Sequence, residues 1–327
     1  MNKVYYTIFI ILISLGFYYF GDVDSFTSAT VVDSYVEDQG DIGIYFCPHQ
    51  DCETALVNFI DSAEEELHCA LFDIGLESVQ KKILEKSKEI DVKIVTDDGY
   101  YKKFNYSFVR KDKSGLMHNK FCIVDGKKIS GGSMNPTDNG AHKNNNNLLL
   151  IESPTLASNY EAEFQEMWEG IYKKGEPVLN PNVKVGDVML ENYFCPDDHC
   201  ANHVKEELKK AELSIHFMTF SFTHEGIANI ILLKHLDNIS IEGVMEARQV
   251  SKYSQFMRLE TAGINVVKDT NPNNMHHKVF IIDNKTVITG SFNPSANGDT
   301  RNDENILIIS SEEIAQKYLE EFERLRS

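Results

Sequence analysis

Two short segments of the chain place histidine, lysine, serine and asparagine at one shared spacing. The first contains Met-His-Asn-Lys at 117–120, and Gly-Ser-Met-Asn-Pro follows at 132–136. The second contains Met-His-His-Lys at 275–278, and Gly-Ser-Phe-Asn-Pro follows at 290–294. Both fit the pattern His-x-Lys-x4-Asp-x6-Gly-Ser-x-Asn. Because residues two apart in a strand point to the same side, each histidine should share a face with its lysine.

These residue types suit the cleavage of a phosphodiester. The anionic oxygens of a phosphodiester repel nucleophiles, so catalysis needs positive charge and hydrogen-bond donors around them. It also needs a nucleophile and an acid that protonates the leaving oxygen, and imidazole can serve as either near neutral pH. The expected catalytic groups are His118, His276, Lys120 and Lys278, and the expected phosphate-binding groups are Asn135, Asn293, Ser133 and Ser291.

The duplicated pattern resembles the signature of the phospholipase D superfamily, and the resemblance spans nearly all of the chain after residue 40. It implies two halves related by a pseudo-twofold axis, with both motifs forming one active site in a monomer. It also implies a covalent phosphohistidine intermediate, no metal and no other cofactor. By this resemblance His118 and His276 are the nucleophile and the acid, and Asp125 and Asp283 are structural supports.

One position near the motifs differs between the two copies. Asn-Asp-Glu-Asn at 302–305 aligns with four asparagines at 144–147, so Glu304 has Asn146 as its counterpart, a further expected structural support. Members of the superfamily often use a carboxylate here to orient a catalytic histidine. A carboxylate beside an imidazole raises its basicity and stabilises its cationic phosphorylated form. If the contact crosses between the halves, Glu304 supports His118, which predicts that His118 is the nucleophile.

An internal duplication positions these motifs. Tyr-Phe-Cys-Pro at 45–48 recurs 148 residues later, whereas the His-x-Lys motifs recur 158 residues apart. Each copy combines apolar residues at helical spacing with continuous apolar runs, which are typical of strands buried on both faces. We therefore predict an α/β fold of two α/β/α sandwich halves, at 41–170 and 186–327, joined by a linker at 171–185.

The N-terminal segment has no charged residue from Val4 to Phe20. Such a run is at the short end of a bilayer span, and no small-x-small cleavage site follows it. We predict an uncleaved transmembrane anchor at 1–21 and a polar tether at 22–40, with a cleaved signal or a buried helix as alternatives. Lys3 before the run and acidic residues after it favour a catalytic body outside the cytoplasm.

Four of the six cysteines form two matched Cys-x4-Cys segments, Cys47 with Cys52 and Cys195 with Cys200. In an exported protein this pattern predicts two local disulfides. His49 and His199 lie in the same segments, so a zinc site is an alternative, as are reduced thiols. Cys69 and Cys122 fall in apolar strands, where we expect buried, unreactive thiols.

The remaining histidines carry weaker signals. His68 and His216 lie in matched strands and are expected to be core residues, whereas His142 and His277 are expected at the surface or behind the catalytic groups. Basic and aromatic residues alternate at 100–106, just before the first motif. This loop could stack single-stranded bases, meet a lipid surface, or simply be partly buried.

Composition limits the substrate without identifying it. The formal net charge is −18, so a polyanion is repelled at long range and must meet a local basic pocket. The predicted anchor and the lack of an extended basic stripe favour a phospholipid. The compact size favours an endonuclease acting on DNA or RNA, since compact members of the superfamily are often nucleases. A catalytically silent, membrane-tethered phosphodiester-binding module is the third possibility.

Overall fold

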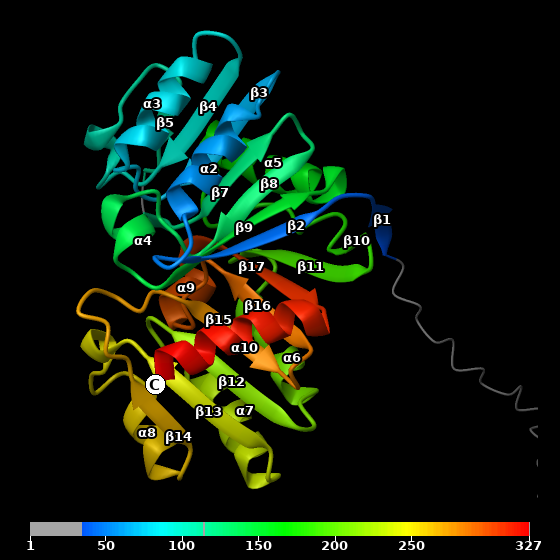
Figure 1. Cartoon of the computed structure of the whole chain (residues 1–327), viewed down its shortest axis with the longest axis vertical. Coiled ribbons are helices and arrows are strands. Elements are labelled where there is room, and N and C mark those ends of the chain that lie inside the picture. Colours follow the sequence, from blue (N-terminus) through cyan, green and yellow to red (C-terminus); the bar gives the residue numbers. More distant parts are fainter. Residues whose placement is uncertain (1–34, 114, 327) are drawn as a thin grey trace, which may run out of the picture. The chain divides into compact units, whose positions relative to one another are not determined.

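The computed structural model describes residues 35–113 and 115–326, which belong to one compact unit. It has an α/β fold in which the duplication is visible as two sheets, each covered by helices on both faces (Figure 1). The predicted anchor at 1–21 lies outside the described residues, as does the tether up to residue 34. Among the described residues, no helix has the length and apolar character needed to cross a membrane.

The first half is built on a seven-stranded sheet. In sheet order its strands are β2 (Ile42–Cys47), β9 (Asn146–Glu152), β8 (Lys128–Gly132), β7 (Lys120–Val124), β3 (Glu66–Leu71), β4 (Asp91–Thr96) and β5 (Val109–Lys111). Its helices are α2 (Cys52–Asp61) and α3 (Glu77–Lys86) on one face and α5 (Pro154–Glu169) on the other. Alternation along β3 sets this division, because Leu67 and Cys69 pack with α2 and α3, whereas Ala70 packs with α5.

The second half is built on a ten-stranded sheet. In sheet order its strands are β1 (Val36–Asp38), β10 (Asn182–Val185), β11 (Val188–Cys195), β17 (Asn302–Ser310), β16 (Thr286–Gly290), β15 (Lys278–Ile282), β12 (Ser214–Thr219), β13 (Ser240–Met245) and β14 (Asn265–Lys268), with β6 (Leu116–Met117) beside β17. Its helices are α6 (Cys200–Lys209), α7 (Glu225–Leu236) and α8 (Phe256–Thr261) on one face and α10 (Glu312–Arg326) on the other. Shorter helical segments are α4 (Asp138–His142), α9 (Ala296–Thr300), η1 (Tyr101–Lys103) and η2 (Ala247–Gln249).

Three short strands cross the boundaries predicted from the sequence. β1 lies in the predicted tether and pairs in parallel with β10, which lies in the predicted linker. β6 belongs to the first half by sequence, yet it pairs in parallel with β17 of the second half. These strands contain two to four residues and no apolar run, so no periodicity marked them. The two halves are therefore joined by backbone pairing as well as by side chains.

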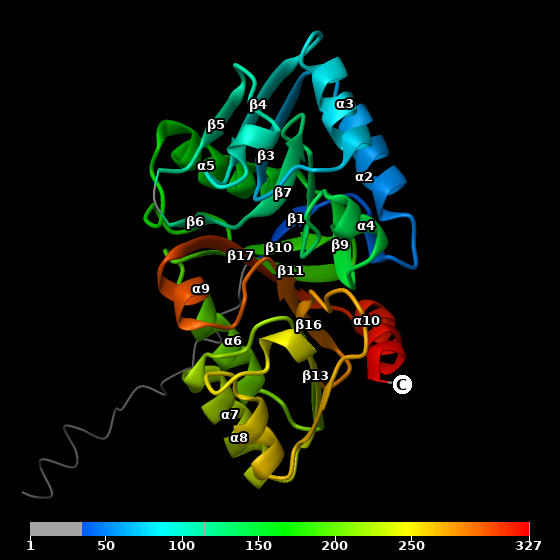
Figure 2. The same ribbon diagram turned by 90° about the vertical axis from the view of Figure 1, so that its left-hand side faces the viewer.

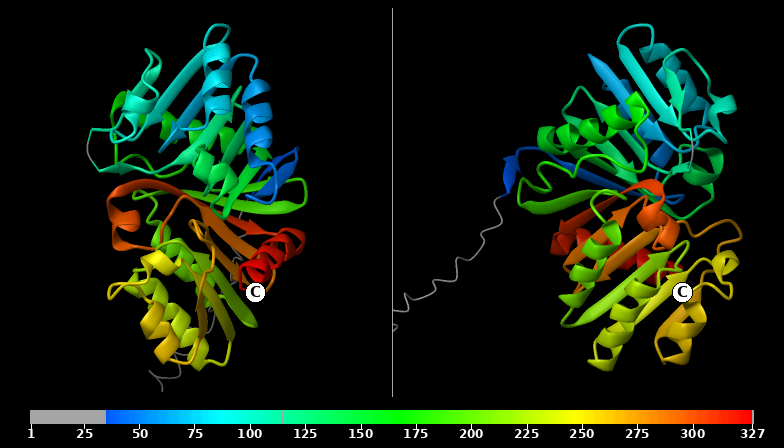
Figure 3. Two further views of the ribbon diagram at one scale, coloured as in Figure 1. Left: turned by 60° about the vertical axis from the view of Figure 1, so that its left-hand side comes forward. Right: turned by 180° about the vertical axis from the view of Figure 1, so that it is seen from behind.

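One hydrophobic core joins the two halves, and it contains residues of α5 and α10 together with strands of both sheets. Tyr160 of α5 packs edge to face on Phe194 of β11, with ring centroids 4.9 Å apart. Tyr318 of α10 packs in the same way on Phe46 of β2, at 5.0 Å. The two contacts involve equivalent positions of the repeat, so the packing is reciprocal. Figures 2 and 3 show the halves meeting along β9, β11 and β17.

All six cysteines form disulfides. The predicted local pairs, Cys47–Cys52 and Cys195–Cys200, are confirmed, and no thiolate of these segments remains for a zinc site. The prediction of free thiols at Cys69 and Cys122 is wrong, because these two residues are also bonded to each other. They lie directly opposite one another on the antiparallel strands β3 and β7, with their Cα atoms 4.0 Å apart. The register of two strands that are distant in sequence decides this pair.

Candidate active site

The backbone of each motif histidine is held by the other half of the molecule. The N–H of His118 donates to the carbonyl of Asp303 at 3.0 Å, and the N–H of His276 donates to the carbonyl of Asn145 at 2.8 Å. Met117 pairs with Asp303 and Met275 bridges to Asn145 in the same reciprocal manner. Each histidine therefore lies two residues before its own strand, β7 or β15, and contacts the start of the last sheet strand of the other half, β17 or β9.

The side chain of each histidine also contacts a residue of the other half. His118 Nδ1 lies 2.7 Å from the carboxylate of Glu304, which is fully buried. His276 Nδ1 lies 2.8 Å from Oδ1 of Asn146 and 3.1 Å from the carbonyl of Ser133. The crossing contact that the sequence suggested for Glu304 is therefore present. Since Nδ1 is engaged in both rings, Nε2 is the ring atom left for chemistry on each histidine.

Each lysine lies beside the histidine of its own motif. Lys278 Nζ donates to the carbonyl of His276 at 2.8 Å and lies 3.2 Å from Nε2 of the same ring. Lys120 Nζ donates to the carbonyl of His118. Both lysines are only 3% exposed, and each ammonium lies over an aromatic ring, Phe72 or Phe220. The expected common face of histidine and lysine is confirmed for both motifs.

The four groups act on one another electrostatically across the two halves. Burial, and then the charges of Lys120 and Lys278, lower the pKa of His118 well below its usual value. Burial, and then Lys278, Lys120 and His118, do the same to the pKa of His276. Burial lowers the pKa of Lys120 to about 7 and that of Lys278 well below its ordinary range. The protonated forms of these buried histidines and lysines favour an anion bound between them. The negative charge of such an anion would raise all four pKa values again.

Glu304 carries the negative charge of the cluster. Burial raises the pKa of its carboxyl to about 7, and the charge of Lys120 is the largest opposing effect. Asn146, at the equivalent position, is uncharged, so the two imidazoles have different partners. The site is therefore symmetrical in geometry and asymmetrical in charge.

The asparagines and serines of the motifs are placed differently. Asn135 and Asn293 are half-buried, and within residues 35–113 and 115–326 neither buried amide oxygen has a hydrogen-bond partner. Ser133 and Ser291 are fully buried, with their hydroxyls bonded to the amide or backbone of Asn147 and Asn305. These contacts hold the serines against the neighbouring strand, and their binding of phosphate stays a prediction.

The aspartates of the motifs hold turns together. Asp125 accepts hydrogen bonds from the N–H groups of residues 64–66, and Asp283 accepts them from residues 212–214. Both aspartates adopt a left-handed backbone conformation, with φ angles of 52° and 54°. Aspartate tolerates this conformation in turns, where its side chain can hydrogen-bond to the backbone. Each aspartate thus ties the turn after β7 or β15 to the segment leading into β3 or β12, which is the structural support that the resemblance implied.

Two phenylalanines beside the histidines were not singled out from the sequence. Phe72 packs edge to face on His118, with centroids 4.9 Å apart, and Phe220 does the same on His276 at 4.7 Å. They occupy equivalent positions just after β3 and β12, so the repeat itself carried a signal for them. Tyr100 of the aromatic and basic loop packs on Phe72, and the ammonium of Lys103 lies over the Tyr100 ring. This loop therefore borders the site on the side of the first half.

The other histidines lie away from the motifs. His68 is buried and bonded to Glu161 at 2.9 Å, as expected of a core histidine, whereas His216 is only half-buried. His142 pairs with Glu53 at the surface. The surface alternative for His277 is wrong, since its ring is completely buried and its Nε2 lies 3.0 Å from a carboxylate oxygen of Glu321 on α10.

Comparison with known proteins adds to this geometry. A family model described as "Cardiolipin synthase, PLD-like domain" matches residues 56–168 and 204–326, one copy in each half. A phospholipase D of Rickettsia typhi is 33% identical over 128 residues, which cover 39% of this chain and 63% of that protein. A mitochondrial cardiolipin hydrolase of Xenopus laevis is 30% identical over 154 residues, covering 46% of this chain and 70% of that protein.

A solved structure resembles the whole folded unit. The crystal structure of phosphatidylserine synthase from Haemophilus influenzae superposes with a TM-score of 0.66 and 12% identity, covering 86% of this chain and 85% of that one. At this identity the likeness concerns the fold. The chain also spans less than two thirds of the length of the first rickettsial relatives that it matches.

Proposed function

This chain belongs to the phospholipase D superfamily, whose model matches both of its halves, and we propose that it hydrolyses phosphodiesters through a covalent phosphohistidine. One observation carries the proposal: each motif histidine is buried beside the lysine of its own motif, and its backbone N–H is bonded to the opposite half. Each histidine is oriented through Nδ1 by a residue of the opposite half. Both motifs therefore form a single site in one chain, as expected from the pseudo-twofold arrangement.

In the first step, Nε2 of His118 attacks phosphorus and the bond from phosphorus to the leaving oxygen breaks. Glu304 accepts the Nδ1–H of His118, which keeps Nε2 unprotonated and stabilises the cation that forms on phosphorylation. His276 donates its Nε2 proton to the leaving oxygen. The negative charge of the bound diester favours the protonated form of His276 and opposes the effect of the lysines.

In the second step, His276 is neutral and takes a proton from water. The water oxygen attacks phosphorus, and the bond from phosphorus to Nε2 of His118 breaks. Lys120, Lys278 and the Nδ2–H groups of Asn135 and Asn293 donate hydrogen bonds to the phosphoryl oxygens in both steps. The chain supplies every charged group that these steps use.

We propose a phospholipid as the substrate. The relatives named phospholipase D and mitochondrial cardiolipin hydrolase support this, as does the acidic net charge of −18, which weakens binding of long polyanions. The predicted membrane anchor would hold the site near a bilayer, with the body outside the cytoplasm. Three disulfides support that location, because disulfides persist in oxidising compartments.

An endonuclease is the second candidate function. The aromatic and basic loop supports it, because Tyr100 and Lys103 lie beside Phe72 at the border of the site, where an unpaired base could stack. A silent phosphodiester-binding module is the third candidate. The intact pair of motifs speaks against it, since binding alone would not require two oriented imidazoles.

One comparison of substrates tests these candidates. Full-length protein in detergent micelles, with EDTA present, is incubated with phospholipids in mixed micelles and separately with single-stranded and double-stranded nucleic acid. We expect release of the lipid headgroup and no shortening of the nucleic acids, and no turnover by a His118→Asn variant with an unchanged circular dichroism spectrum. Shortened nucleic acid with intact lipid would establish the nuclease, and inactivity on every diester would refute the enzymatic proposal.

A further inference from the structure

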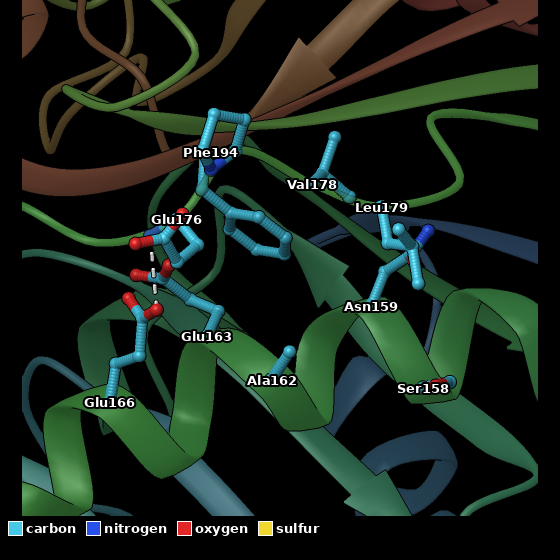
Figure 4. Close-up of a pocket in the computed structure, with 10 residues that line it drawn as sticks. Ser158, Asn159, Ala162, Glu163, Glu166, Glu176, Val178, Leu179 and Phe194 are labelled. Atoms are coloured by element: carbon cyan, nitrogen blue, oxygen red, sulfur yellow. Dashed lines mark hydrogen bonds between the residues drawn. The ribbon is translucent and has the colours of Figure 1, made fainter.

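A second group of charged side chains lies where α5 meets the linker and the loop after β11. One carboxylate oxygen from each of Glu163, Glu166 and Asp197 lies within 4.8 Å of the other two. Glu163 and Glu166 also line a cavity of about 320 Å³, and Figure 4 shows their carboxylates next to each other below Glu176. None of these residues belongs to the phosphodiesterase site described above.

Glu163 has no neutralising partner in the described part of the chain. It is 8% exposed, and across residues 35–113 and 115–326 its carboxylate makes neither a hydrogen bond nor an ion pair. The charges with the largest effect on it belong to Asp303, Asp197, Glu166 and Asp198, all negative, and together with burial they raise its pKa well above the usual value. A buried carboxylate is normally paired with a cation or bound to a metal.

The neighbouring carboxylates are fixed in place by the backbone. Glu166 accepts a hydrogen bond from the N–H of Glu176 at 3.0 Å. Its carboxylate lies so close to Gly175 that a Cβ at that position would be 1.8 Å from Oε2. The N–H of Gly175 also acts on the carboxyl of Asp197 and opposes the raising of its pKa by burial. The linker therefore holds two acidic side chains against a third instead of separating them.

The repeat provides an internal comparison for this group. The position equivalent to Glu163 is Glu321 of α10, which is also buried. Glu321 is neutralised within the chain by His277 at 3.0 Å and by Arg324 at 2.6 Å. In addition, His49 lines the same cavity as Arg324. In the second half, both groups that are bonded to this glutamate can carry positive charge.

In the first-half environment, the equivalent positions carry no positive charge at all. His277 is replaced by Asn119, Arg324 by Glu166, and His49 by Asp197. The aromatic contacts of Tyr160 and Tyr318 show that the two environments are also equivalent in space. The same buried glutamate thus faces cationic groups in one half and two additional carboxylates in the other. A bound cation from solution would neutralise this excess of negative charge.

We propose that Glu163, Glu166 and Asp197 bind one hard divalent cation, Ca²⁺ in particular. Carboxylate oxygens without nitrogen or sulfur ligands suit Ca²⁺, and water and backbone carbonyls would complete its six to eight ligands. Because Glu163 and Glu166 belong to α5 and Asp197 to the loop after β11, the ion would join the two halves. Asp303, whose carbonyl receives the N–H of His118, lies close enough to act on Glu163.

Calorimetric titration of CaCl₂ into metal-depleted, full-length protein in detergent at pH 7.5 tests this site. We expect one Ca²⁺ per chain, a thermal midpoint several degrees higher with Ca²⁺, and at least tenfold weaker binding by Glu163→Gln. The matched control is Asp98→Asn in the other acidic group of the chain, formed by Asp97, Asp98 and Asp112, and it should bind Ca²⁺ as the wild type does.

Two results would overturn the proposal. The first is absence of Ca²⁺ binding by the wild type. If the Glu163→Gln variant is then also more stable, with or without Ca²⁺, Glu163 is held as the neutral acid. The second is loss of binding in Asp98→Asn with binding retained in Glu163→Gln. Neither readout involves turnover, so failure of this site and failure of the proposed phosphodiesterase activity are distinguishable.

Discussion

Replacing Glu304 by glutamine tests the asymmetry on which the choice of nucleophile rests. The amide introduced by Glu304→Gln keeps the size of the side chain, and its oxygen can still accept the Nδ1–H of His118. The negative charge beside the imidazole is removed, together with the oxygen that accepts a hydrogen bond from Nδ2 of Asn302. His118 then has the same kind of partner that His276 has in Asn146.

The size of the effect follows from that contact. A hydrogen bond to a charged group contributes about 1.5–3 kcal/mol and a neutral one about 0.5–1.5 kcal/mol. The difference of about 1–1.5 kcal/mol corresponds to roughly 5- to 13-fold in rate. Two unit charges about 4 Å apart at an effective dielectric constant of about 20 interact by about 4 kcal/mol, which sets an upper limit of about a thousandfold. We therefore expect kcat/KM to fall by between about fivefold and about a thousandfold.

The pH profile adds a second readout. Burial raises the pKa of Glu304 to about 7, so its carboxylate gains a proton, and His118 loses a charged partner, as the pH falls through about 7. In the wild type, kcat/KM for the chromogenic diester bis(4-nitrophenyl) phosphate should decline on this acidic side. In Glu304→Gln that decline should be absent. A variant with wild-type kcat/KM and the same acidic limb would refute the reasoning.

The same asymmetry predicts where the phosphoryl group is bound. Acid-free denaturing quench of the wild type during turnover, followed by peptide mapping, should find phosphate on His118. The exchanged pair, Glu304→Gln with Asn146→Asp, places the carboxylate beside His276 and should move the phosphate to that residue. Phosphate on His276 in the wild type would reverse the assignment of nucleophile and acid.

Three further predictions follow from the described contacts. Lys278→Met should remove turnover and raise the thermal midpoint, because burial and Lys120 oppose the charge of Lys278, and added phosphate should stabilise the wild type more than the variant in a thermal melt. Replacing Cys69 and Cys122 by alanine opens a loop with a sequence separation of 53. It should cost about 4 kcal/mol in urea unfolding, against about 2 kcal/mol for the short Cys47–Cys52 loop. Asp283→Ala leaves three backbone N–H groups without their acceptor and should lower the free energy of unfolding by about 2–4 kcal/mol, with kcat per folded molecule unchanged.

Much of the site could be predicted because its information is local. A strand period of two places His118 with Lys120, and the structure shows the lysine at the carbonyl of that histidine. The repeat then assigns the same arrangement to the second motif. The close spacing of Cys47 and Cys52 likewise left few ways to pair them.

The errors share one physical origin, which is pairing between segments that are distant in sequence. Cys69 and Cys122 were expected to be separate thiols until the register of β3 against β7 placed them opposite each other. The environment of Ser133 has the same origin, because the adjacent β9 supplies the amide oxygen of Asn147 that accepts a hydrogen bond from its hydroxyl. In both cases the outcome depends on which strand lies next to the residue.

By itself, the sequence determined the α/β class and the duplication, and it predicted the chemistry of the two motifs and two local disulfides, because residue type, period and short spacing carry this information. Only the tertiary structure decided that His118 and His276 exchange partners between the halves, and that Glu163 lacks the cationic neighbours of Glu321. Such contacts arise when the two sheets pack against each other, and no local pattern of residues records the neighbours that packing brings.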